Sequence, residues 1–125
     1  MKYIDAATSL ARDLERGGSL EGVRSGLRLA VMAWRELGDS DPALDRFGLE
    51  VLAAEELLRH LPIAATLCDP PALGDPEVRF ELAAVVAAVA DRLALASRDV
   101  TGTLAHRLAC DAAAGLLRRA VGLLP

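Results

Sequence analysis

Several kinds of residue that usually carry chemistry are rare or absent in this sequence of 125 residues. It contains no asparagine and no glutamine, one lysine against 13 arginines, and only four aromatic residues. The two cysteines, Cys68 and Cys110, allow at most one bridge, which excludes a disulfide-stapled scaffold, and we expect them to be free thiols. Because catalytic and binding sites are built from polar groups in an apolar setting, this composition offers few candidates for a site.

Strong positive charge and long apolar segments are also absent. The net charge is −4 and the isoelectric point is about 5.1, so the chain as a whole does not attract nucleic-acid phosphates. The longest apolar run spans residues 82–90, whereas a membrane-spanning helix needs about 20 residues, and Lys2 and Asp5 interrupt any secretory signal. We expect a cytoplasmic protein with no nucleic-acid partner and no membrane partner, and the preference for arginine over lysine is typical of high-GC bacteria.

Alanine and leucine together fill 47 of the 125 positions, and their spacing predicts helices throughout the chain. Five segments have helical periodicity between start and stop signals, namely residues 2–16, 19–37, 41–60, 75–96 and 100–125. Residues 68–74 hold two of the six prolines and show no periodicity, so they form the one substantial loop. The sequence therefore predicts an all-α fold, a single-domain bundle of about five helices over residues 1–125.

Short polar residues, glycine and proline mark the expected helix ends. Ser19 is expected to cap the second helix, and Gly38 to follow its end in the C′ position. Asp41 and Pro42 open the third helix, since proline is tolerated at the first helical position. This helix should end near residue 60, although a kinked continuation through residues 63–67 is left open.

Two of the expected helices have apolar faces too wide for one neighbour to cover. On a helical wheel the second helix carries an apolar arc of about 200°: Leu20, Val23, Gly26, Leu27, Ala30, Val31, Ala33, Trp34 and Leu37. The fourth carries a ridge of large residues beside a smooth face of alanines: Val78, Leu82, Val85, Val86, Val89 and Leu93, then Ala83, Ala87, Ala90 and Ala94. We expect this Ala/Val-rich helix to be central. Because the last helix also has a wide apolar arc, the surplus apolar surface predicts a homodimer.

The histidines and cysteines are the ligand types of a zinc site, but their spacing does not support one. Only His106 and Cys110, at i and i+4 on the last helix, are placed to meet one metal. His106 falls on the apolar side of its helix and His60 on the polar side of the third helix, so the two should lie in different environments. We expect no metal and no cofactor, a buried histidine at 106 and an inert buried thiol at 110.

The segment from Leu104 to Cys110, read as Leu-Ala-His-Arg-Leu-Ala-Cys, resembles the phosphorylated helix of histidine phosphotransfer domains, which are also helical bundles. The resemblance covers seven residues and implies His106 as the phosphate acceptor. The sequence departs from that pattern at Ala109 and Cys110, where those domains usually carry lysine and glycine.

The best polar feature is a basic stripe on the second helix. Arg24, Arg28 and Arg35 lie within about 40° of one another on the wheel. One interpretation is a solvated face with local partners such as Glu21, and the other is a docking surface for a carboxylate or phosphate group, which the forked donors of arginine suit. These three arginines and Trp34 are the predicted binding residues.

No nucleophile–base pair, glycine-rich phosphate loop or paired catalytic carboxylate emerges from the spacing. Glu50, Glu55 and Glu56 are acidic, but they lack the histidine partners of a ferritin-like metal site. We therefore predict an accessory or interaction protein that binds a peptide, a helix or a small molecule in an apolar groove. The alternative is a small enzyme that positions a substrate in a natural-product pathway such as lanthipeptide cross-linking, and a phosphotransfer protein is a minor alternative.

Overall fold

The computed structural model describes residues 1–17, 20–63, 68–71 and 76–124. In these residues it contains five α-helices and one short 3₁₀ helix, and no strand. The helices are α1 (Tyr3–Glu15), α2 (Glu21–Leu37), η1 (Gly38–Ser40), α3 (Pro42–Leu57), α4 (Pro76–Arg98) and α5 (Leu104–Gly122). The predicted all-α bundle of five helices is confirmed. None of the described helices combines the length and the apolar character that crossing a bilayer requires.

The start of α3 follows its predicted signal. The Asp41 carboxylate accepts hydrogen bonds from the backbone N–H groups of Ala43 and Leu44, and Pro42 occupies the first helical position. The N-terminus of α5 uses a signal that the sequence analysis missed, since the Thr103 hydroxyl accepts from the His106 N–H. Side-chain caps therefore fix the N-termini of both α3 and α5.

The C-terminal ends of α2 and α3 differ from the prediction. Gly38 does not take a left-handed C′ conformation but, with φ −64° and ψ −32°, continues into the 3₁₀ turn η1. Helix α3 ends at Leu57, three residues before His60, and residues 58–60 form turns. The predicted cap at Ser19 lies outside the described residues, as does most of the open continuation through residues 63–67, and Leu20 precedes α2 without a side-chain cap.

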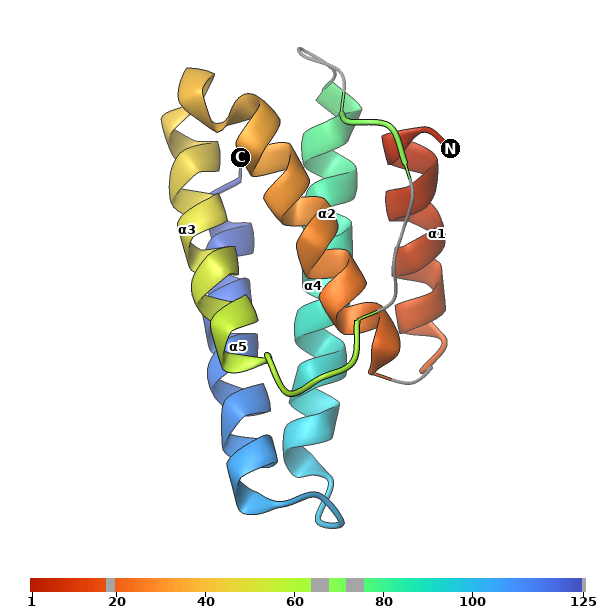
Figure 1. Ribbon diagram of the computed structural model, residues 1–125, viewed down its shortest axis with the longest axis vertical. Coiled ribbons are helices and arrows are strands. Elements are labelled where there is room, and N and C mark those ends of the chain that lie inside the picture. The colour runs from red at the N-terminus through yellow and green to blue at the C-terminus, as the bar shows by residue number, and fades with distance from the viewer. Residues whose placement is uncertain (18–19, 64–67, 72–75, 125) are drawn as a thin grey trace.

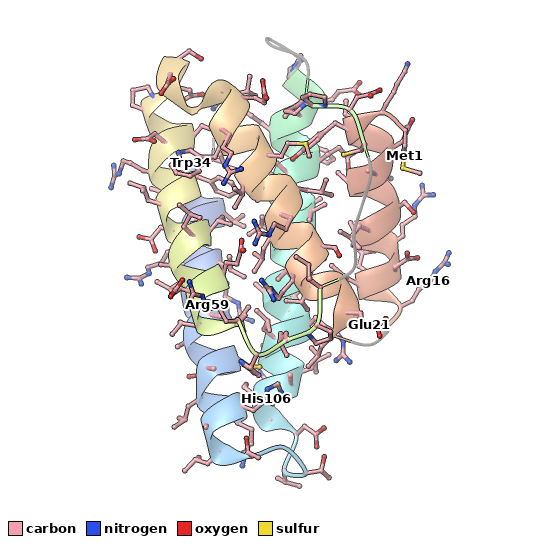
Figure 2. The ribbon with its side chains drawn as sticks, viewed as in Figure 1. Met1, Arg16, Glu21, Trp34, Arg59 and His106 are labelled. Carbon is pink, nitrogen blue, oxygen red and sulfur yellow. The ribbon has the colours of Figure 1, made fainter. Side chains whose placement is uncertain are left out.

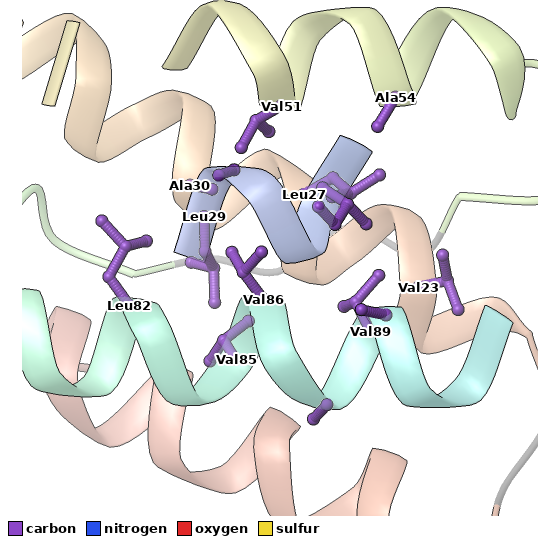
Figure 3. Packing of buried hydrophobic residues seen from close by; sticks show 14 of the residues in the cluster. Val23, Leu27, Leu29, Ala30, Val51, Ala54, Leu82, Val85, Val86 and Val89 are labelled. Atoms are coloured by element: carbon purple, nitrogen blue, oxygen red, sulfur yellow. The ribbon is translucent and has the colours of Figure 1, made fainter. Parts of the chain in front are cut away.

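The core is built around α4. This helix packs against α5, α1 and α2, while α3 packs against α2 and α5. All six residues of its predicted ridge are buried: Val78, Leu82, Val85, Val86, Val89 and Leu93. Figure 3 shows its valines facing side chains of α2, with Val51 and Ala54 of α3 beyond them. On α2, a methyl group at Gly26 would stand 2.8 Å from Val89 and 3.2 Å from Val85, so the missing side chain lets α2 and α4 approach closely there.

The helices lie in two layers, with α2 and α3 in front of α4 and α5, and with α1 beside α4 (Figure 1). The hairpin of α4 and α5 extends past the end of α3. Around its connection, large apolar side chains are exposed: Leu95, Val100, Leu104 and Leu108. This end of the molecule carries apolar surface that no described residue of the chain covers.

Candidate functional site

A buried carboxylate joins Arg24 and Arg28 of α2 to α3. Glu55 lies on the inner side of α3, where its Oε1 atom is 2.8 Å from Nη2 of Arg28 and 3.9 Å from Nη2 of Arg24. The side chains of Glu55 and Arg24 are only 12% and 14% exposed, whereas that of Arg28 is half exposed. A carboxylate at this depth needs a cation beside it, because desolvation otherwise disfavours its charged form. The stripe on α2 is therefore partly directed into the fold.

Arg24 also holds the chain that follows α3. Its Nη1 atom donates to the carbonyl oxygen of Leu61 at 3.0 Å and more weakly to that of Arg59 at 3.5 Å. Carbonyl groups just beyond a helix end lack intrahelical partners, and a guanidinium satisfies them well. Arg24 is thus a structural residue that ties the end of α3 to α2.

These residues surround a small open pocket at the seam between α2 and α3. We call it the arginine pocket; it has a volume of about 130 Å³ and is lined by Arg24, Arg28, Leu52, Glu55, Glu56 and Arg59. Two polar atoms beside it, Nε of Arg24 and Oε2 of Glu55, are buried and make no hydrogen bond within the described structure. Figure 2 shows Arg59 on the α3 side of this seam. Three arginines face two glutamates, so the pocket is locally positive in an acidic protein.

The other two predicted binding residues lie outside the pocket. The Trp34 ring packs on Gly48 of α3 and Gly38, where a methyl group would overlap it, and its Nε1 donates to Oδ1 of Asp45 at 2.8 Å. Arg35 lies exposed in the last turn of α2. Trp34 therefore belongs to the same α2–α3 seam as the arginine pocket, and Arg35 to the open surface beside it.

The two histidines meet, although the helical wheel placed them in different environments. Nε2 of His60 lies 2.8 Å from Nδ1 of His106, and the two rings stand edge to face with centroids 5.1 Å apart. The expectation of separate surroundings was wrong because His60 lies in the turn after α3, where a wheel for α3 no longer applies. His106, labelled near the foot of α5 in Figure 2, is also partly exposed rather than buried.

Cys110 lies on the inner side of this pair. Its Sγ atom is 3.7 Å from Nε2 and 4.0 Å from Nδ1 of His106, and the residue is fully buried. Burial raises the pKa of the Cys110 thiol, so it rests in the protonated, unreactive form. Cys68 is also free, so the predicted free thiols are confirmed. Among the described residues, no three His, Cys, Asp or Glu side chains are grouped to hold a metal ion.

The helical wheel identifies Arg24 and Arg28, both arginines on the α2 side of the pocket, but not Glu55, which joins them. Glu55 was considered only as a metal ligand, and the acidic partner expected for the stripe was Glu21 on the same helix. No local spacing links Glu55 to Arg28, which lies 27 positions earlier, so only the packing of α3 on α2 reveals the pair.

The fold and this seam define the protein as a small all-α bundle with a charged cluster between two helices. No protein-family model matches the sequence, no curated protein matches it, and no solved structure matches it.

Proposed function

We propose that the protein is an accessory protein, homodimeric and cytoplasmic, that binds the acidic group of a partner peptide, protein or small molecule at the α2–α3 seam. The observation that supports this function is the arginine pocket, which has room for one carboxylate or phosphate group. Arg24, Arg28, Arg35 and Trp34 all lie on α2, along or beside this seam. The surplus apolar surface supports the dimer.

The chemistry of the pocket favours an anion. Glu55 is already paired with Arg28, and the half-exposed guanidinium of Arg28 has donors left over. Arg59 pairs with Glu56 at 3.2 Å, but both side chains are mostly exposed, and such a pair is worth less than about 1 kcal/mol. An incoming carboxylate or phosphate therefore loses little by displacing Glu56 and gains two guanidinium groups.

Arg24 plays a different part in this proposal. Its donors already bind the carbonyls after α3, so it sets the floor of the pocket and is not free to turn toward a ligand. Arg28 and Arg59 are the residues that bind, and Trp34 provides apolar surface farther along the seam.

The test is a titration of the ¹⁵N-labelled protein with inorganic phosphate and, separately, with acetate, followed by NMR. We expect shifts in the amides of residues 52–59 and in the side-chain Nε–H signals of Arg28 and Arg59. Arg59→Ala should weaken binding at least tenfold, because one charge-assisted hydrogen bond is worth about 1.5–3 kcal/mol.

The matched control is Arg16→Ala, which removes an exposed arginine from the end of α1 and should leave binding unchanged. Arg28→Lys keeps the positive charge beside Glu55, so the fold should be kept. Because lysine lacks the forked donors of arginine, this variant should bind the anion more weakly. If neither anion moves signals at the seam, or if Arg16→Ala weakens binding as much as Arg59→Ala does, the proposed function fails.

The same pocket would serve the alternative function, a small enzyme that positions a peptide substrate. The supporting observation is its size, which suits the fixing of a single carboxylate while the substrate supplies its own reactive groups. Mass spectrometry of a candidate precursor peptide after incubation separates the two functions, because only the enzyme changes the mass or the connectivity of the peptide.

A further inference from the structure

One face of α5 points entirely to solvent. We call it the α5 outer face, and it consists of residues about one turn apart that are all exposed: Leu104, Leu108, Asp111, Gly115, Arg119 and Gly122. The opposite side of the helix is buried against α3 and α4 through Cys110, Ala113 and Leu117. The leucines at 104 and 108 are 68% and 60% exposed, although leucine gains free energy when it leaves water.

Gly115 lies at the middle of this face, and no packing contact within the single chain requires a glycine there. A methyl group built on it would meet nothing within 4 Å, and the same is true of Gly122. Glycine inside an exposed helix is less favourable than alanine, so the monomer would be more stable with alanine there. A helix surface without side chains is useful where another backbone approaches closely.

The charges on either side of Gly115 are self-complementary. Asp111 lies one turn before it, and Arg118 and Arg119 lie one turn after it. Within the described residues the side chains of Asp111 and Arg119 make no hydrogen bond or ion pair, and Arg118 makes only a long pair of 3.8 Å with Asp91, where both side chains are mostly exposed. If two α5 helices run antiparallel and cross at Gly115, the acid of each copy faces the arginines of the other.

We propose that a second copy of this chain covers the α5 outer face from Leu108 to Gly122, with the two α5 helices antiparallel and a two-fold axis passing beside Gly115. The inference rests on the homodimer of the proposed function and names its interface. Each copy contributes the same patch, as a two-fold interface requires. Asp111 of one copy pairs with Arg118 and Arg119 of the other, twice, and Leu108 of each packs over the Gly122 end of its partner.

The test is a charge-reversal experiment followed by analytical ultracentrifugation up to high micromolar concentration. Asp111→Arg alone places arginine opposite arginine, and Arg118→Asp with Arg119→Asp places aspartate opposite aspartate. We expect the wild type to be a dimer and each variant to dissociate with a constant at least tenfold higher. An equimolar mixture of the two variants restores both pairs and should recover dimers at the wild-type concentration.

The positions are exposed, so the variants should keep the wild-type circular dichroism spectrum, and Asp13→Arg on the exposed side of α1 is the matched charge change that should leave the dimer intact. Gly115→Leu gives a second readout that involves no charge, because its side chain should hold the two helices apart.

The possible failures are distinct. A wild type that stays at 13 kDa at every concentration overturns the dimer and this interface together. A wild-type dimer that neither charge reversal nor Gly115→Leu weakens overturns the α5 interface alone. Anion binding at the arginine pocket is measured separately, so its failure leaves both results standing.

Discussion

Helices α2 and α5 both lie against α3, and both carry arginines beside an apolar face, but they use their charges in opposite ways. On α2, Arg24 and Arg28 reach across to Glu55 and to the carbonyls after α3, so they bind within the fold. On α5, Asp111 and Arg119 stand on the outer face without a described partner. Whether the charges of a helix pair within the fold or point to solvent therefore depends on the helix opposite them as much as on their own spacing.

The same contrast holds for the glycines. Gly48 of α3 touches the Trp34 ring and makes room for it, so its missing side chain is explained inside the monomer. Gly115 of α5 touches nothing within 4 Å of where a methyl group would stand. Gly48 lets α2 and α3 pack closely at their seam, and Gly115 leaves the α5 outer face open to the close approach of another helix.

The largest effect expected is at the buried carboxylate of the α2 seam. Glu55→Gln leaves Arg24 and Arg28 without their counter-charge, and we expect it to lower the free energy of unfolding by about 2–3 kcal/mol. Glu56→Gln, one position along α3 but mostly exposed, should change it by less than about 0.5 kcal/mol. Urea denaturation of both variants measures the difference. Equal effects would mean that the arginine pocket has no buried ionic core and that the contrast with α5 is false.

The matched pair of glycines gives the next largest effect. Gly48→Ala forces the Trp34 ring to shift and to lose its bond to Asp45, which should cost about 2 kcal/mol. Gly115→Ala meets open space and should stabilise the monomer by up to about 1 kcal/mol. Thermal denaturation in dilute solution, where the monomer dominates, compares the two. If Gly48→Ala lowers the stability and Gly115→Ala raises it, the distinction between a closed α2–α3 seam and an open α5 outer face is supported. A loss of stability in Gly115→Ala would contradict it.

The local features of the structure, namely the helices and their apolar faces, could be predicted from the sequence. Periodicity and caps predicted five helices and the start of α3, because those signals act over one or two turns. The ridge of α4 was equally clear, since six large residues share one side of a single helix. Contacts between helices were not predictable in this way. The link from Arg28 to Glu55 and the meeting of His60 with His106 depend on how α3 packs and where it ends.

The two histidines link the turn after α3 to α5 through their rings. Nε2 of His60 and Nδ1 of His106 lie 2.8 Å apart, so one ring donates and the other accepts. His60→Ala removes this bond and the edge-to-face ring contact, and it should lower the free energy of unfolding by about 1 kcal/mol. Urea denaturation of wild type and variant measures this loss. A variant as stable as the wild type would show that the contact between the rings contributes nothing to the fold.

The smallest effect is expected in the short connection between α4 and α5, residues 99–103, where the hydrogen bonds join residues close in sequence. The Thr101 hydroxyl donates to Asp99 at 2.7 Å and the Thr101 N–H donates to the same oxygen at 3.0 Å, and these bonds lower the pKa of Asp99. A carboxyl whose pKa is lowered by folding stabilises the fold above its unfolded pKa of about 3.9 and loses that contribution as the pH falls through its folded value.

The stability difference between wild type and Thr101→Val should therefore be constant at pH 7 and pH 5 and smaller at pH 3, as measured by urea midpoints. Thr101→Ser keeps the hydroxyl that donates to Asp99, so it is the control and should follow the wild type at all three pH values. A difference that persists at pH 3 would mean that the hydroxyl acts without the charge of Asp99. A difference that becomes smaller at pH 3 would mean that the local bond between Thr101 and Asp99 helps to orient α5, whereas α2 is held by a carboxylate from α3. Because α5 is held in this local way, its outward charges stay available to another molecule.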